Sequence, residues 1–250
     1  MTSRWLQLRI ATIDRVVAGV LSVLVAPAIA VMAALVRRDG DPARPLLRLV
    51  RMGRGRTPIR VWKVRTMRSA HADGRADGPG LTRADADDRI TPIGRRLRHL
   101  RLDELPQLWN VVTGSMALLG PRPEAIEYVE PDDQRWDEVL AVAPGIAGPT
   151  QLLVHDWETT AMGGEDFTEV YRHVILPVKL AIDQWYVRTA SPAIDLLVVG
   201  SLVQRFVLGR TPTRLRCRVA RDVPQVGEVT PVWGSFAPSA EIMRRSHASP

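Results

Sequence analysis

The most prominent pattern in this chain is an uninterrupted apolar stretch near its N-terminus. Residues 16–36 carry no charged side chain. As a helix rising about 1.5 Å per residue, they would extend roughly 31 Å, which matches the hydrocarbon core of a bilayer. A buried soluble helix and a signal peptide are alternatives, but a typical signal core has only roughly 7 to 15 apolar residues. The pattern therefore predicts a membrane anchor over residues 1–38.

Pro27 interrupts this stretch near its middle, where a proline removes one backbone hydrogen bond and favours a bend. Arginines lie on both sides of the stretch, with Arg4, Arg9 and Arg15 before it and Arg37 and Arg38 after it. The positive-inside rule therefore gives no direction. A helix that bends at Pro27 and returns to the face it entered keeps both clusters on one side. We expect a re-entrant helix hairpin over about residues 16–36.

Basic positions dominate the segment after the anchor. Residues 37–68 contain eleven Lys or Arg and two acids, and we expect them to lie on anionic lipid headgroups, each cation contributing about 1 kcal/mol. Apolar and basic residues alternate from Ile59 to Arg65, which predicts a short strand with one solvated face. Residues 69–88 have no apolar period and predict a loop.

Helical spacing returns after residue 89. It predicts a first helix through about Leu100, and Pro106 predicts that a second helix begins there, because proline is tolerated in a first turn. Asp103 and Glu104 then fall at the N-terminal end of that helix, where the backbone favours negative charge, including a bound phosphate. By themselves, two adjacent acids are more typical of a solvated helix corner.

The C-terminal half predicts two longer helices, at about residues 167–188 and 192–208. The second has an apolar side that either packs in the core or lies in the membrane interface. From Thr211 onward no clear period is present, and little regular structure is expected.

Composition narrows the classes of partner. A net charge of +7 and a pI near 10.6 favour anionic partners: nucleic acid, acidic lipids or phosphorylated small molecules. Cys217 is the only cysteine, so no intrachain disulfide forms, which fits a reducing compartment. The five histidines lie far apart, so no zinc site is expected.

Two proline-containing loops complete the set of motifs. In "GPRPE", prolines on both sides of Arg122 hold the backbone extended, which suits a bidentate phosphate contact, although a plain surface turn is the alternative. "APGIAGPTQ", residues 143–151, is a second rigid loop.

The order of these motifs resembles the bacterial sugar transferases, the monotopic polyprenyl-phosphate phosphoglycosyl transferases. The matching segments are the anchor around Pro27, "WKVRTM" at 62–67, residues 89–124 with "LDELPQLWNV" and "GPRP", residues 143–151, "LAIDQWYVR" and "PAIDLL". The resemblance covers residues 10–207. It implies a helix-rich α+β fold in which residues 1–38 form a Pro-bent re-entrant membrane anchor. Residues 39–207 would be a compact catalytic domain with a small β element, and residues 208–250 a poorly structured tail.

The resemblance also implies a reaction. Such enzymes transfer a sugar 1-phosphate from a UDP-sugar to polyprenyl (undecaprenyl) phosphate, release UMP and begin a surface polysaccharide such as an exopolysaccharide. The implied location is the inner membrane, with the catalytic domain on its cytoplasmic face. Implied partners are UDP-sugar, polyprenyl phosphate and anionic lipids, without nucleic acid; the sugar and the oligomeric state are not predicted.

Residue roles follow from the same resemblance. Asp103 would be the nucleophile that forms an aspartyl phosphosugar, and Glu104 would hold Mg²⁺ or act as a base. Neighbouring helical residues point about 100° apart, which disfavours a shared-proton dyad. Arg98, Arg122, Lys63 and Arg65 would bind phosphate groups. Asp183 and Asp195 also match family positions, with helix-cap or salt-bridge roles equally open.

The chain departs from the family pattern at several positions, none of which is a proposed catalytic group: Ala26, Val64, Leu100, Arg101 and Ser115. Two other functions remain as alternatives: a membrane-tethered basic module without enzymatic activity, and an inactive relative. A nucleic-acid module is disfavoured because its arginines would need interleaved stacking aromatics, and the acid pair would repel a phosphate backbone.

Overall fold

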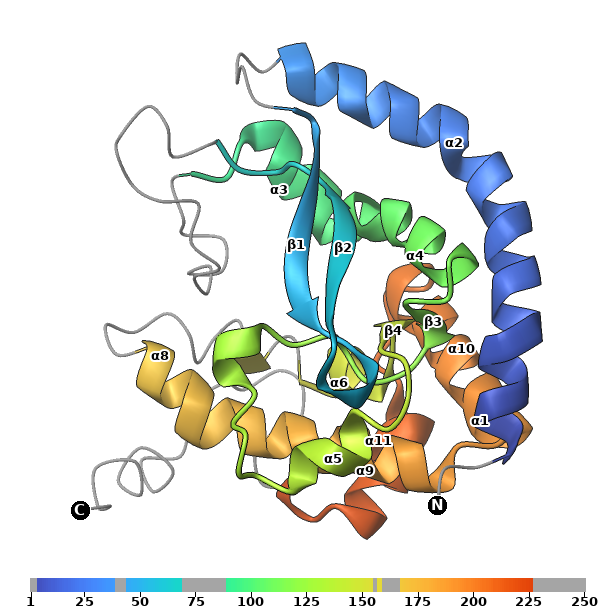
Figure 1. Cartoon of the computed structure of the whole chain (residues 1–250), viewed down its shortest axis with the longest axis vertical. Helices are drawn as coiled ribbons and strands as arrows, with labels where there is room; N and C mark the ends of the chain where they lie inside the picture. The colour runs from blue at the N-terminus through green and yellow to red at the C-terminus, as the bar shows by residue number, and fades with distance from the viewer. Residues whose placement is uncertain (1–3, 39–43, 69–88, 155–156, 159–166, 227–250) are drawn as a thin grey trace.

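The helix-rich α+β architecture is shown in Figure 1, a computed structural model that describes residues 4–38, 44–68, 89–154, 157–158 and 167–226. The loop predicted at residues 69–88 lies outside the described residues. Within them, the strands form two separate two-stranded sheets. The helices surround both sheets, and the α+β class predicted from the sequence is therefore confirmed.

The N-terminal segment is one continuous helical rod. It consists of α1 (Arg4–Leu8), the π-helical turn η1 (Arg9–Ile13) and α2 (Asp14–Arg38). Among the described residues, this stretch is the one long and apolar enough to cross a membrane. The helix continues through Pro27, so the predicted hairpin is not present as two helices joined by a turn. Instead α2 arcs along one side of the molecule (Figure 1).

Both ends of α2 pack against the rest of the chain although most of the helix is exposed. Near its start, the fully buried Ala18 packs with Leu108 and Met116. Near its end, Met32 and Val36 belong to a separate apolar cluster around Val64. α2 is therefore fixed at two distant points to the same folded body.

A buried ion-pair cluster also fixes the start of the rod. Arg9 donates to Asp195 at 2.6 Å and lies 3.3 Å from Asp14. Its second partner on the folded body is the hydroxyl of Tyr186, at 2.8 Å. Arg9 is only 4% exposed. Of the two roles left open for Asp195, the structure supports the salt bridge.

The first sheet is the antiparallel hairpin of β1 (Leu46–Met52) and β2 (Pro58–Val64), with Leu46 opposite Val64. The short 3₁₀ turn η2 (Arg54–Arg56) connects them, with Gly55 and Arg56 in left-handed conformation. The strand predicted over 59–65 is confirmed, with its end one residue earlier.

The segment that carries the acid pair follows this hairpin. α3 (Pro92–His99) begins at Thr91, whose hydroxyl accepts a hydrogen bond from the Gly94 amide at 2.9 Å. The chain then forms the 3₁₀ helix η5 (Leu102–Gln107) and α4 (Leu108–Val112). The predicted helix start at Pro106 is thus wrong: the helical segment begins at Leu102 as a 3₁₀ helix that contains Pro106, and the α-helix begins at Leu108. Pro106 has no N–H to donate, which fits the absence of a regular α-helix through this point.

The second sheet pairs β3 (Ala117–Leu119) in parallel with β4 (Gly145–Ala147). Between these strands lie η6 (Ile126–Tyr128) and α5 (Arg135–Val139), and α6 (Pro149–Leu153) follows them. The two proline-containing loops recognised in the sequence therefore meet along this small sheet.

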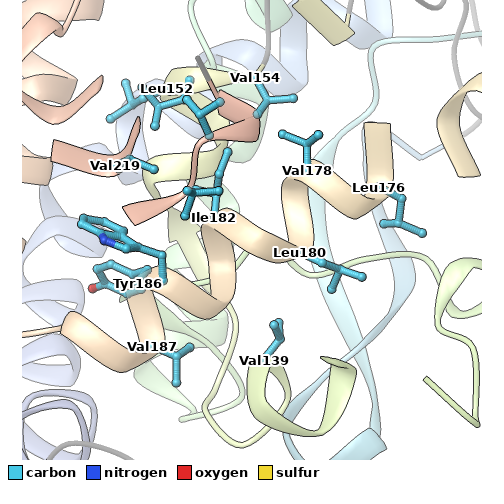
Figure 2. Close-up of a cluster of buried hydrophobic side chains, with 14 of the residues drawn as sticks. Val139, Leu152, Val154, Leu176, Val178, Leu180, Ile182, Tyr186, Val187 and Val219 are labelled. Atoms are coloured by element: carbon cyan, nitrogen blue, oxygen red, sulfur yellow. The ribbon is translucent and has the colours of Figure 1, made fainter. Parts of the chain in front are cut away.

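The largest core cluster surrounds α9 (Leu176–Thr189), which continues from α8 (Phe167–Val170) and the π-helical turn η7 (Tyr171–Ile175). Figure 2 shows Leu176, Leu180 and Val187 along one side of α9 and Val178 and Ile182 on another. Val139, Leu152 and Val219 pack against the helix from α5, α6 and α11. A helix that is apolar on all sides is a core helix.

The C-terminal elements are α10 (Pro192–Phe206) and α11 (Thr213–Asp222). Both long helices predicted for the C-terminal half are confirmed. The expectation of little regular structure after Thr211 is wrong for α11, where Leu215 and Val219 are fully buried. These residues are four apart and form one helical face, which the many surrounding arginines obscured in the sequence.

Candidate active site

The acid pair is buried at the start of η5, with Asp103 only 1% and Glu104 5% exposed. A solvated helix corner is therefore excluded. Isolated buried carboxylates are strongly unfavourable, so each requires basic or hydrogen-bonding neighbours. Two segments distant in the sequence and one adjacent arginine supply them.

Lys63, near the end of β2, bridges the two acids. Its Nζ lies 2.9 Å from Oδ2 of Asp103 and 3.6 Å from Oε1 of Glu104. One ammonium group therefore lies within ion-pair distance of both carboxylates, although their side chains leave the 3₁₀ helix about 120° apart.

Arg122, in the loop that follows β3, pairs with Glu104. Its Nη2 donates to Oε1 at 2.7 Å and its Nη1 to Oε2 at 3.4 Å. Burial alone would raise the pKa of Glu104, but the charges of Arg122 and Lys63 hold that pKa well below its usual range. Glu104 is therefore ionised throughout the physiological pH range.

Arg101 is a third cation at this site, with its Nη1 3.6 Å from Oε1 of Glu104. It occupies the left-handed conformation, with φ 57°, between α3 and η5. Such a conformation costs a non-glycine residue about 1–3 kcal/mol and tends to occur at functional sites. Burial, together with the charge of Arg122, lowers the pKa of Arg101. Three cations thus surround two acids, which leaves one positive charge for an anionic ligand.

Asp103 differs from Glu104 in its unsatisfied oxygens. Lys63 approaches Oδ2 closely, yet neither carboxylate oxygen of Asp103 accepts a hydrogen bond of good geometry, and both are buried. Buried carboxylate oxygens in this state are costly in the absence of a ligand. Asp103 is consequently the acid with free capacity to contact a phosphorus atom or a metal ion.

Asn110 on α4 fixes the strand that carries Lys63. Its side-chain oxygen accepts a hydrogen bond from the Trp62 amide at 3.0 Å, and its Nδ2 donates to the Arg60 carbonyl at 2.8 Å. The acids lie on η5, which α4 directly follows. α4 therefore positions the strand that carries Lys63 relative to the acids. Sequence reasoning missed Asn110, although it lies within the recognised "LPQLWNV" motif.

Glycines position the segment that carries Arg122. The Gly145 amide donates to the Pro121 carbonyl at 2.8 Å. A Cβ on Gly145 would lie only 2.1 Å from the Gly120 nitrogen, so a side chain here would force the two loops apart. This close backbone contact explains why "GPRP" and "APGIAGP" occur together.

Glu124, two residues after Arg122, ties the same segment to the core. It accepts a hydrogen bond from the Tyr171 hydroxyl at 2.6 Å and lies 3.2 Å from Nζ of Lys179. Burial would raise the pKa of Glu124, but the charge of Lys179 lowers it. Lys179 also pairs with Glu158 at 3.3 Å. Sequence reasoning missed this cluster, and the one available signal was the acid that ends "GPRPE".

Asp183 lies one helical turn beyond Lys179 on α9. Burial raises its pKa to about 7, although the Thr150 hydroxyl donates to it at 2.5 Å. The structure therefore gives it neither a cap nor a salt-bridge partner in the described contacts, but a hydrogen-bonding role between α9 and α6.

The structure places the four predicted phosphate-binding residues in different surroundings. Lys63 and Arg122 contact the acid pair, and Arg101, which was counted only as a departure, joins them. Arg65 donates through Nε to the Arg44 carbonyl at 2.9 Å, at the entry to β1. Arg98 is half-buried on α3, and its phosphate role stays a prediction.

A metal site of three or more acidic, histidine or cysteine ligands is not found within the described part of the chain. Mg²⁺ often binds one or two carboxylates together with substrate phosphates. The unsatisfied oxygens of Asp103 fit such a role. Each oxygen of Glu104 accepts one hydrogen bond from Arg122, and a carboxylate oxygen has a second lone pair that a metal ion can use.

Comparison with known proteins supports the resemblance noted in the sequence. The model of the Bacterial sugar transferase family matches residues 5–209. A UDP-glucose:undecaprenyl-phosphate glucose-1-phosphate transferase from Caulobacter vibrioides is 36% identical over 77% of this chain and 67% of its own length. One of the same name from Escherichia coli is 32% identical over 74% of this chain but 37% of its own.

A third relative, an exopolysaccharide production protein from Rhizobium leguminosarum, is 30% identical over 75% of this chain and 90% of its own length. The chain thus spans between about a third and nine tenths of these relatives. The matched region contains α2, both sheets and every residue of the acid site. From the family match and these relatives, the chain belongs to the bacterial sugar transferase family and is a transferase.

Proposed function

We propose that this protein transfers a sugar 1-phosphate from a UDP-sugar to polyprenyl (undecaprenyl) phosphate, releases UMP and so begins a surface polysaccharide. One observation carries the proposal: the buried carboxylate of Asp103 has unsatisfied oxygens beside Lys63, in a site where three cations surround two acids. The names of two relatives, both UDP-glucose:undecaprenyl-phosphate glucose-1-phosphate transferases, support the choice of substrates.

In the first step, an oxygen of Asp103 attacks the β-phosphorus of the UDP-sugar. A bond forms between that oxygen and phosphorus, the bond from phosphorus to the bridging oxygen breaks, and UMP leaves with the electron pair. Lys63, Arg101 and Arg122 neutralise the charge that develops on the phosphate oxygens. Arg98 and Arg65 are proposed to bind phosphate groups of the two substrates.

In the second step, an oxygen of the polyprenyl phosphate attacks the phosphorus of the aspartyl phosphosugar. The carboxylate of Asp103 leaves, and a polyprenyl diphosphate sugar forms. Glu104 remains ionised through both steps and holds Lys63 and Arg122 in place. Mg²⁺ would be held by Glu104 together with the substrate phosphates, and it would supply further charge neutralisation to the diphosphate.

The location we propose is the inner membrane, with the acid site at the cytoplasmic face. Both ends of the helical rod over residues 4–38 are tied to one folded body, through Arg9 and Asp195 near the start and through Val36 near the end. A straight span would separate those ends by the full hydrocarbon thickness, about 30 Å. The two attachments therefore favour an anchor that enters and leaves on the same face, with anionic lipids against the exposed Arg4, Arg37 and Arg38.

The experiment is UMP release by the full chain in detergent, measured with a panel of UDP-sugars, undecaprenyl phosphate and Mg²⁺. We expect UMP release with at least one sugar, and that release to depend on the lipid acceptor for multiple turnovers. Absence of UMP release with every sugar would contradict the proposal and would favour a binding module or an inactive relative.

A further inference from the structure

A cavity of about 390 Å³ adjoins the acid site, and its walls are almost entirely apolar. η5 and α4 contribute Leu105 and Leu108, and α10 contributes Leu202 and Phe206. The reaction steps described above make no use of this space. A cavity of this size and lining is typical of a site for an apolar ligand.

The polar boundary of the cavity coincides with the acid site. Arg101 and Glu104 line the cavity and also belong to the cluster around Lys63 and Arg122. A ligand that fills the cavity therefore places one end beside the excess positive charge. That arrangement complements a molecule with an anionic head joined to a hydrocarbon body.

One wall of the cavity continues into exposed apolar surface. Phe206 lines the cavity and is 44% exposed, and Val203 and Val207 on the same segment are also exposed. α2, the apolar helix of the proposed anchor, contacts η5 and α4. With this apolar surface in a bilayer, as the proposed anchor implies, a lipid-soluble molecule would enter the cavity past Phe206.

We infer that this cavity binds the isoprene units next to the phosphate of the polyprenyl phosphate acceptor, with that phosphate beside Arg101. The inference rests on the proposed function and adds the place where the hydrocarbon of the acceptor binds. The remainder of the long chain stays in the bilayer.

The chemistry of the lining favours an isoprenoid over a phospholipid. In a polyprenyl phosphate, hydrocarbon follows the phosphate oxygen directly. In a phospholipid, glycerol ester groups stand between the phosphate and the acyl chains, and they would lie unpaired among Leu102, Leu105 and Leu118. Burial of such polar groups without hydrogen bonds is unfavourable.

The test compares Leu202→Trp, which fills the cavity, with Leu196→Trp on the same helix, where the side chain is 73% exposed and does not line the cavity. KM is measured for undecaprenyl phosphate and for UDP-sugar in detergent, with thermal unfolding of each variant. We expect Leu202→Trp to raise the acceptor KM about tenfold, in the range that a hydrophobic pocket discriminates, while the KM for UDP-sugar stays unchanged. The control should change neither.

Phe206→Ala keeps the test valid if the larger substitution reduces folding, because Phe206 is already half exposed. We expect it to raise the acceptor KM several-fold. Unchanged acceptor KM in both variants, or equal rises for both substrates, would overturn the inference. Competition by phosphatidylglycerol that disappears in Leu202→Trp would also overturn it, since a phospholipid would then be the occupant. Failure of the proposed function is distinguishable, because the wild-type chain would then release no UMP.

Discussion

The ammonium of Lys63 lies 2.9 Å from Oδ2 of Asp103, and 40 residues of sequence separate the two. The contact exists because β2 lies beside η5 and because Asn110 binds the backbone of β2 from α4. The packing of β2 against η5 thus brings the two charged groups together.

Loss of Lys63 should lower both activity and stability, because it leaves two buried acids with less countercharge. Lys63→Met removes the cation that bridges both acids, and we expect kcat for UMP release to fall on the order of 100-fold, as for other charge-stabilising groups. Lys63→Arg should retain part of the activity because the charge remains. The measurement is steady-state kinetics with thermal unfolding of each variant. Full activity of Lys63→Met would exclude a role for this lysine in the site.

Asp183 should make the stability of the protein depend on pH. Its pKa is raised from 3.8 to about 7 by burial, so between these values the folded chain binds one more proton than the unfolded chain. The free energy of unfolding contributed by Asp183 is therefore fully present below the lower value and falls as pH rises toward 7, by at most about 1.4 kcal/mol per pH unit.

The control for this effect is Asp183→Asn, which cannot ionise. Thermal unfolding between pH 5 and pH 7, a window chosen because Glu104 and Glu124 titrate below it, should show a smaller loss of stability with pH in the variant. Thr150→Val removes a hydrogen bond that lowers the pKa of Asp183 and should shift the loss to higher pH. Identical slopes in the wild type and Asp183→Asn would contradict the assignment.

The ion pair between Arg9 and Asp195 should determine how firmly the anchor is held. Asp195→Asn leaves the buried Arg9 with only part of its countercharge, and we expect it to lower the free energy of unfolding by about 3 kcal/mol. Glu169→Gln is the matched control, since its pair with His173 is exposed and such pairs contribute about 1 kcal/mol or less. The free energy of unfolding of each variant is measured by chemical unfolding in detergent. Equal losses would show that the buried pair contributes no more stability than the exposed pair.

The sequence predicted the acid site better than it predicted the contacts that build it. "LDELPQLWNV" and "GPRP" identified Asp103, Glu104 and Arg122 because the chemistry of those residues is local to short motifs. The role of Arg101 depends on a left-handed backbone conformation at the end of α3, which the pattern did not reveal.

The fold was predictable where the pattern is periodic, as in β2, α9 and α10. Pairings between distant segments were not, because nothing in one segment encodes the register of the other. The Glu124–Lys179 pair and the meeting of Gly120 with Gly145 are of this kind. The sequence analysis missed α11 for another reason: its apolar face consists of only Leu215 and Val219.

The topology of the anchor can be tested with single cysteines. In a Cys217→Ser background, Arg4→Cys and Arg38→Cys place one thiol near each end of the helical rod. A re-entrant anchor predicts that an impermeant thiol reagent leaves both unlabelled in intact cells and labels both after the inner membrane is opened. Labelling of one position alone in intact cells would show that the helix spans the membrane.

The most direct test of the central claim is the intact mass of the full chain after incubation with its UDP-sugar and Mg²⁺ in the absence of lipid acceptor. The account predicts one added sugar phosphate, stoichiometric UMP and a modified peptide that contains Asp103. In Asp103→Asn both the added mass and the UMP should be absent, while Glu104→Gln should keep the site of attachment even if the rate falls. Wild-type turnover with lipid acceptor that persists in Asp103→Asn would contradict the claim that Asp103 is the nucleophile.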